Sequence, residues 1–195
     1  MNNLAEILVK NYPKQVKLDD GTVITLRPLL KEDGQAFLAY FQSLEPGELA
    51  RLKEEVTDPK VIEFWIDNLD YDLMLPLIAL HGERIIGAAS LQFNLSAWTR
   101  HKGEVNLSTD PQSRAKGLGT LLIQNLEEIA AELGLEQLTA EIPPELDKAF
   151  YLFEELGFEK AAVLQGFVMD KAGHESDIVL MLKSLAPAES EFSHT

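Results

Sequence analysis

The stretch that decides the fold is Arg114-Ala115-Lys116-Gly117-Leu118-Gly119-Thr120. It lies between a short strand pattern and a long amphipathic helix pattern. Its two glycines remove side chains where a loop opens a helix, so several backbone N–H groups can converge on an anion, with the helix dipole behind them. The pattern Arg-x-x-Gly-x-Gly therefore predicts a phosphate-binding loop, and a turn that merely starts the helix is the alternative left open.

Two better-known phosphate-binding patterns do not fit this loop. A P-loop needs Lys and then Ser or Thr after its last glycine, and Thr120 and Leu121 stand there. A dinucleotide-binding fingerprint would need a third glycine at position 122, which is Leu122. The loop is therefore of another kind.

The segments that flank the loop predict a strand, a helix and a second strand. Residues 104–109 alternate apolar and polar side chains, as a half-exposed strand does. Residues 119–133 carry an apolar stripe and end at Gly134, as a helix does, and residues 135–142 predict the next strand. Such a crossover makes its two strands parallel and places the loop at the carboxyl end of the first.

The rest of the chain predicts short helices and antiparallel strands. The helices are expected at residues 3–10, 33–44, 59–69 and from Pro143-Pro144 to Gly157; the strands are expected at 16–18, 23–26, 75–80, 84–93, 158–169 and 177–182, with turns at Asp19-Asp20-Gly21 and residues 170–173. The predicted class is α/β (α+β), with a mixed, mostly antiparallel central sheet. We expect one domain over residues 1–185, with residues 1–21 as an N-terminal extension and residues 186–195 as a disordered tail.

Composition narrows the partners of this chain. With 195 residues, 46% of them hydrophobic, it can bury a real core as one domain. The net charge of −15 argues against nucleic acid and anionic membranes. The sequence holds no basic leader with an apolar block and no membrane-length apolar run, so a cytoplasmic location is expected. It has no cysteine, and its four histidines lack metal-ligand spacing, so neither disulfides nor a metal site are expected.

Charge is distributed unevenly along the chain. Residues 100–120 hold four basic and two acidic side chains, a cationic island around the predicted phosphate loop. Residues 45–72 hold nine acidic and three basic side chains. This acidic excess is either a patch that steers a cationic acceptor or an ordinary solvated surface.

Several motifs resemble the GNAT superfamily of acyl-CoA-dependent N-acetyltransferases. Besides the glycine loop they are Leu26-Arg27-Pro28-Leu29, Thr109-Asp110-Pro111-Gln112-Ser113-Arg114 and Phe153-Glu154-Glu155-Leu156-Gly157-Phe158. The order of predicted elements over residues 22–183 is also the order of this family. The segment from Trp98 to Glu104 is similar to members that acetylate small-molecule or peptide amines. The resemblance implies a GNAT-like sheet with a β-α-β core that binds acyl-CoA.

The resemblance further implies which residues hold acetyl-CoA, or another acyl-CoA, as co-substrate. The pyrophosphate would bind amides of the seven loop residues, Arg114, Ala115, Lys116, Gly117, Leu118, Gly119 and Thr120. Leu107, Ser108 and Thr109 would hold the pantetheine arm by strand-like hydrogen bonds, and Phe153 completes the cofactor-binding set. A backbone amide fixed near the thioester carbonyl would stabilise developing oxyanion charge.

The reaction implied is transfer of the acetyl group to a primary amine, of a small molecule or a peptide, by direct attack in a ternary complex. An alkyl ammonium has a pKa of about 10.4, so a base must assist. Glu104, just before the donor-binding residues, is the leading candidate; a strand-end charge is its alternative role, and His101 is the second choice. The family's usual tyrosine acid is replaced by Phe153. Nearby Tyr151, although on the polar side of its helix, is the candidate acid.

Two other functions remain open from the sequence. Phe153 and Leu146 stand where the family often has tyrosine and asparagine, which motivates a catalytically silent acyl-CoA-binding sensor or interaction module. A structural domain that binds no CoA is the third reading. Family members often pair, so a homodimer is also an open alternative.

Overall fold

The computed structural model describes residues 3–45, 49, 52, 54–169 and 173–185. The tail predicted at residues 186–195 lies outside this range, and so does most of the turn predicted at residues 170–173. Among the described residues, no helix is both long enough and apolar enough to cross a membrane.

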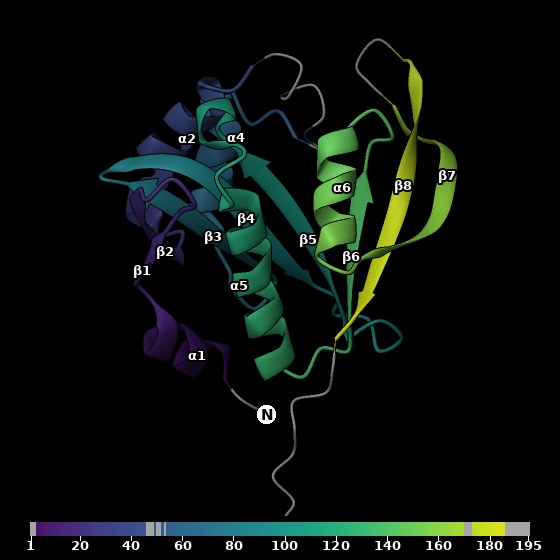
Figure 1. Ribbon diagram of the computed structural model, residues 1–195, viewed down its shortest axis with the longest axis horizontal. Helices are drawn as coiled ribbons and strands as arrows, with labels where there is room; N and C mark the ends of the chain where they lie inside the picture. The colour runs from purple at the N-terminus through teal and green to yellow at the C-terminus, as the bar shows by residue number, and fades with distance from the viewer. Residues whose placement is uncertain (1–2, 46–48, 50–51, 53, 170–172, 186–195) are drawn as a thin grey trace, which may run out of the picture.

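One eight-stranded sheet runs through the molecule in the order β1-β2-β3-β4-β5-β6-β8-β7 (Figure 1). Its strands are β1 (Lys14–Lys17), β2 (Val23–Pro28), β3 (Met74–His81), β4 (Arg84–Phe93), β5 (Lys102–Thr109), β6 (Gln137–Ile142), β7 (Glu159–Met169) and β8 (Glu175–Ser184). Neighbouring strands pair antiparallel except β5 and β6, which are parallel. The predicted mixed, mostly antiparallel α/β fold is confirmed.

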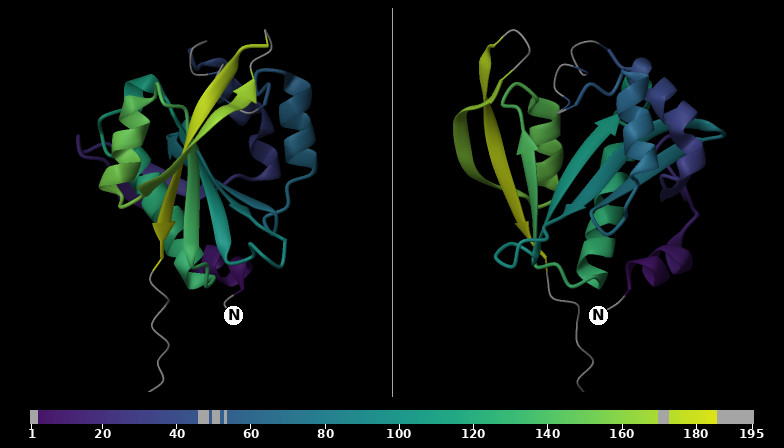
Figure 2. Two further views of the ribbon diagram at one scale, coloured as in Figure 1. Left: turned by 90° about the vertical axis from the view of Figure 1, so that its right-hand side faces the viewer. Right: turned by 180° about the vertical axis from the view of Figure 1, so that it is seen from behind.

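Helices cover both faces of the sheet. They are α1 (Leu4–Asn11), α2 (Gly34–Gln42), α4 (Pro59–Asp67), α5 (Leu118–Glu132) and α6 (Asp147–Glu155), with 3-10 turns η1 (Lys31–Asp33) and η2 (Pro111–Ser113). Figure 2 shows α5 and α6 on one side of the sheet and α2 and α4 on the other.

The local signals for helix ends act mostly as expected. The Asp58 side chain accepts from the Lys60 amide and Pro59 fills the first turn, so α4 begins where the sequence predicts. The helix expected to open at Pro143-Pro144 instead begins at Asp147. Proline disfavours helical backbone in the residue before it, so Pro144 disfavours a helical turn at Pro143, and the helix begins only later.

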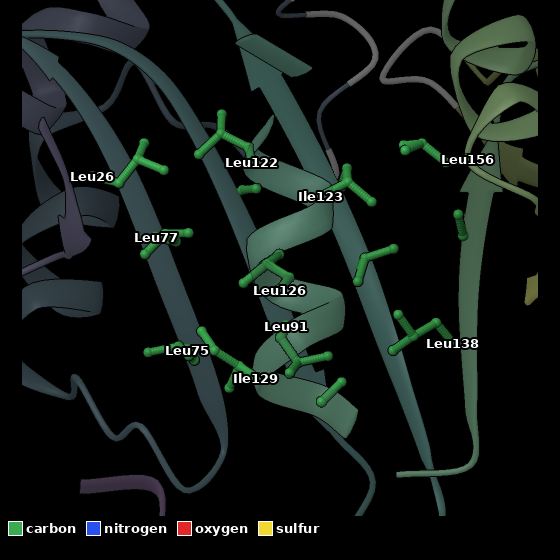
Figure 3. Packing of buried hydrophobic residues seen from close by; sticks show 14 of the residues in the cluster. Leu26, Leu75, Leu77, Leu91, Leu122, Ile123, Leu126, Ile129, Leu138 and Leu156 are labelled. Carbon is green, nitrogen blue, oxygen red and sulfur yellow. The ribbon is translucent and has the colours of Figure 1, made fainter. Parts of the chain in front are cut away.

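The core fills both sides of the sheet. On one side the predicted stripe of α5, with Leu122, Leu126 and Ile129, packs on Leu75 and Leu77 of β3 (Figure 3). On the other side α2 and α4 cover the alternate β3 residues, which include Ile78 and Leu80. β3 is therefore buried on both faces, which holds the central strands in a fixed position beneath α5.

Candidate functional site

The parallel contact between β5 and β6 is short. Only Lys102, Gly103 and Glu104 of β5 pair with β6, opposite Gln137, Leu138 and Thr139. Beyond Glu104 the two strands diverge, as Figure 1 shows, while β4 stays paired with β5 to its end at Thr109. From Val105 onward, the edge of β5 that faces β6 pairs with no strand in the described part of the chain, so its peptide groups can take another hydrogen-bonding partner.

The hydrogen bonds at each end of β5 identify the peptide groups on this edge. The His101 carbonyl accepts from the amides of Glu136 and Gln137, on the β6 side. The Asp110 amide donates to Ile86 of β4. Successive peptide groups along a strand face alternate edges, so Val105, Leu107 and Thr109 face the open edge and the even-numbered residues face β4.

The three residues predicted to hold a pantetheine arm are thus divided by the structure. Leu107 and Thr109 direct their peptide groups to the open edge, and the Thr109 carbonyl accepts from Arg114 Nη2 at 3.3 Å. The peptide groups of Ser108 face β4. The Ser108 Oγ lies 2.8 Å from the hydroxyl of Tyr40, on α2. Any contribution of Ser108 is therefore through its side chain on the α2 side.

Tyr40 is a residue at this site that the sequence did not single out. Its side chain is buried, and burial raises the pKa of its hydroxyl above the usual value. Along β5, the side chains of Glu104 and Asn106 lie on the same α2 side as that of Ser108. The side-chain nitrogen of Asn106, Nδ2, lies 3.5 Å from Glu104 Oε1. The only sequence signal for Tyr40 is its place in the apolar stripe of a helix, which suggests packing alone.

The glycine loop has an unusual backbone just before α5. Ala115 and Gly117 adopt left-handed conformations with φ of 56° and 78°, and Gly117 caps the start of α5. Gly119 serves another purpose, because a Cβ there would lie 3.0 Å from Leu152 and 3.2 Å from Leu107. The glycine lets the first turn of α5 approach β5 closely. Leu118 is buried, so only its amide is available to a ligand.

The β1–β2 hairpin packs against this loop. The Asp19 amide donates to the Lys116 carbonyl at 3.1 Å, and Lys116 Nζ lies 3.0 Å from the Asp20 carboxylate. Hydrogen bonds from Thr22 and then from Lys116 lower the pKa of Asp20 to about 2. The cationic island expected for residues 100–120 is therefore partly neutralised by acids that come from far earlier in the chain.

The candidate catalytic side chains lie in different settings. Glu104 is the last residue of β5 that pairs with β6, and it lies at the start of the open edge. Tyr151, on α6, is 63% exposed. Phe153 is 4% exposed, with its ring edge-on to Phe158 at 5.0 Å between centroids, so it belongs to the core. The catalytic roles of Glu104 and Tyr151, and a cofactor contact by Phe153, stay predictions.

His101, the second choice of base, lies in the turn before β5. Its carbonyl already anchors the start of β6 through the two amide contacts described above. The backbone of His101 is thus structural, and nothing in this geometry favours it over Glu104 as the proton acceptor.

The sequence of this chain is similar to those of known acetyltransferases. The sequence model of the acetyltransferase (GNAT) family matches residues 35–158. A [ribosomal protein bS18]-alanine N-acetyltransferase of Salmonella typhimurium is 30% identical over 77 residues, which are 40% of this chain and 52% of the relative. The chain thus spans about half the length of the curated relatives it matches.

Solved structures share the fold over much more of the chain. A ribosomal-protein-alanine N-acetyltransferase from Brucella melitensis superposes with a TM-score of 0.71 at 26% identity, covering 82% of this chain and 99% of the other. A phosphinothricin acetyltransferase from Sinorhizobium meliloti, solved in complex with AcCoA, gives 0.69 at 22% identity, covering 87% of this chain and 95% of the other. The second likeness concerns the fold alone.

Proposed function

The chain belongs to the acetyltransferase (GNAT) family, and from this premise we propose that it transfers an acetyl group from acetyl-CoA to a primary amine in a ternary complex. The observation that carries the proposal is the early end of β5–β6 pairing at Glu104, which leaves an open strand edge beside a glycine loop. An open edge and a phosphate cradle in series suit a ligand with an amide-bearing arm and a pyrophosphate.

The residues present fit such a donor. Peptide groups of Val105, Leu107 and Thr109 would pair with the amides of the pantetheine arm, as a further strand would. Amides between Arg114 and Thr120 would bind the pyrophosphate at the N-terminus of α5. Acetyl-CoA supplies an activated thioester when bound. In this proposal Ser108 contributes through its side chain, and Phe153 supports the site from the buried side of α6.

The chain's own groups then act on the incoming amine. Glu104 would accept a proton from it, directly or through water, and so make its nitrogen nucleophilic. A new C–N bond would replace the C–S bond, while an amide on the open edge stabilises charge on the carbonyl oxygen. A thiol pKa of about 8.5 allows the thiolate to leave near neutral pH, with Tyr151 or water as proton donor.

We propose a peptide amine as the acceptor, with a small-molecule amine as the other candidate. The support is that proteins similar to this chain are named as ribosomal-protein-alanine N-acetyltransferases. The acidic excess over residues 45–72 would favour a basic peptide, although several of these residues lie outside the described part of the chain. We also propose that the protein acts in the cytoplasm.

The alternative is a catalytically silent acyl-CoA-binding module. The specific observation that favours it is the position of Phe153, which is packed in the core where the family resemblance expects a tyrosine. Such a module would bind acetyl-CoA with the same open edge and loop but would release no thiol.

The test is a thiol-release assay with acetyl-CoA and three acceptors: a peptide with N-terminal alanine, an N-terminally blocked lysine peptide and a polyamine. The proposal predicts amine-dependent release of CoA, fastest with the free peptide N-terminus. Acetyl-CoA binding without release by any acceptor would favour the silent module, and the absence of both would contradict the proposal.

A further inference from the structure

The N-terminal extension reaches the phosphate loop from outside the family's matched region. The family model covers residues 35–158, whereas Asp19 and Asp20 lie at the tip of the β1–β2 hairpin. Both lie against the loop: the Asp20 carboxylate pairs with Lys116, and the Asp19 carboxylate lies close to Gly117. Two carboxylates at the place where a polyanion is expected to bind would weaken its binding, so their presence needs an explanation.

We propose that the Asp19–Asp20 tip is a built-in anionic competitor that holds Lys116 and opposes the phosphates of acyl-CoA, so that this hairpin sets the affinity of the enzyme for its donor. The inference rests on the proposed function, because it assumes that the loop binds acyl-CoA.

The first line of support is the pairing of Lys116. Its ammonium lies 3.0 Å from Asp20, and the other Asp20 oxygen accepts from the Thr22 amide at 2.9 Å. The Asp20 carboxylate is therefore held in place by its own hairpin before any ligand arrives. The hydrogen bonds from Thr22 and Lys116 lower its pKa, so the carboxylate is charged near neutral pH. A phosphate that uses Lys116 must displace this fixed partner.

The second line is the position of Asp19. Its amide fastens the tip to the loop through the Lys116 carbonyl. Its carboxylate lies 2.8 Å from the point that a Cβ on Gly117 would occupy. Gly117 caps α5, where the positive end of the helix dipole attracts anions. The carboxylate therefore reduces the positive potential that would otherwise draw in a pyrophosphate.

The simpler reading is that these contacts only attach the extension to the domain. The two readings differ in the sign of their effect. A purely structural clamp, once weakened, would loosen the loop and weaken donor binding. A competitor, once neutralised, would free Lys116 and strengthen donor binding.

The test is calorimetric titration of CoA into wild type, Asp20→Asn, Lys116→Gln and the double variant. We expect Asp20→Asn to bind about threefold tighter, the size expected of an exposed ion pair. Lys116→Gln should bind more weakly. When Lys116 is already replaced by Gln, Asp20→Asn should increase the affinity for CoA much less, because the lysine that it would free is absent. Asp19→Asn should also tighten binding.

The matched control is Glu6→Gln, which removes one negative charge from the same extension but lies in α1. It should leave the dissociation constant unchanged, and thermal unfolding should verify that every variant is folded. Equal or weaker binding by Asp20→Asn, or full tightening without Lys116, would overturn the inference while leaving the proposed function intact. If folded wild type binds no CoA, both fall.

Discussion

Glu104 is the side chain whose place in the fold bears most directly on chemistry. It stands where β5 stops pairing with β6, and the Asn106 amide lies near its carboxylate. We expect Glu104→Gln to lower kcat by about 100-fold, the lower end of what a positioned base contributes, because the amide cannot take a proton. Acetyl-CoA affinity, measured by calorimetry, should be unchanged since Gln keeps the shape of the side chain.

The matched control for this prediction is Glu136→Gln, an exposed position in the turn before β6. It should retain wild-type kcat. Equal activity in both variants would remove Glu104 from the mechanism and leave water or another group as the proton acceptor.

Arg27 and Asp33 provide a residue-scale test of stability. Arg27 Nη1 and Nη2 lie 2.5 and 2.7 Å from the two Asp33 oxygens, and the Leu30 amide donates to the same carboxylate at 2.8 Å. Burial opposes ionisation of Asp33, but the Arg27 and Leu30 hydrogen bonds outweigh it and lower its pKa. The two-point geometry ties β2 to the turn before α2.

A carboxylate with a lowered folded-state pKa stabilises the fold above its unfolded pKa of about 3.9, and this contribution is lost as pH falls through the folded value. We expect Asp33→Asn to cost about 1–2 kcal/mol at pH 7, between the values for neutral and for charged hydrogen bonds, because the pair is only partly buried. The difference from wild type should shrink on acidification below pH 4. Urea unfolding at pH 7 and pH 3 measures it; an equal difference at both would contradict the ionic account.

At this scale the sequence predicts what is local. The cap by Asp58 depends on neighbouring residues, and the structure confirms it. The contacts of Tyr40 and Asp19 at the site could not be predicted, because their partners, Ser108 and Lys116, are far along the chain. No spacing rule links such pairs before the sheet order is known.

At the scale of elements, Gly103 lies in the short paired segment of β5 and β6, opposite Leu138, where there is little room for a side chain. A Cβ there would lie 2.6 Å from Leu91, 3.1 Å from Leu135 and 3.2 Å from Leu138. We expect Gly103→Ala to cost about 1–3 kcal/mol through overpacking, measured by urea unfolding. Gly87→Ala should cost less, because the leucine methyl groups nearest to its Cβ are no closer than 3.1 Å. A larger loss of stability in Gly87→Ala than in Gly103→Ala would mean that the leucines around Gly103 can move to accommodate a Cβ.

The strands and helices themselves were predictable, because period and turn residues are local properties. The extent of β5–β6 pairing was not. Alternation in residues 104–109 predicts a strand but cannot say that its pairing with β6 ends at Glu104. The residues around this junction, Leu91, Leu135 and Leu138, come from three separate segments that meet only in the folded sheet.

At the scale of the whole molecule, the N-terminal extension is fastened to the helix that follows the phosphate loop. Asn125 of α5 is buried, and its Oδ1 accepts from Tyr12 and Lys14, each at 3.1 Å. We expect Asn125→Ala to cost about 1–3 kcal/mol, because two donors lose their buried acceptor. Limited proteolysis should then cut the extension faster than in wild type.

The control for this prediction is Tyr12→Phe, which removes only one of the two donors and should give a smaller loss. Equal protease resistance in Asn125→Ala and wild type would mean that the apolar contacts of α1 hold the extension without this hydrogen-bonded anchor.

The central claim, that the glycine loop binds an acyl-CoA, is tested most directly by calorimetric titration of acetyl-CoA into wild type, Gly117→Glu and Gly134→Glu. Gly117 and Gly134 bound the two ends of α5 with similar φ of 78° and 81°, so both variants carry similar backbone strain. We predict that wild type and Gly134→Glu bind acetyl-CoA and that folded Gly117→Glu does not. Equal binding by both variants, or no binding by folded wild type, would contradict the account.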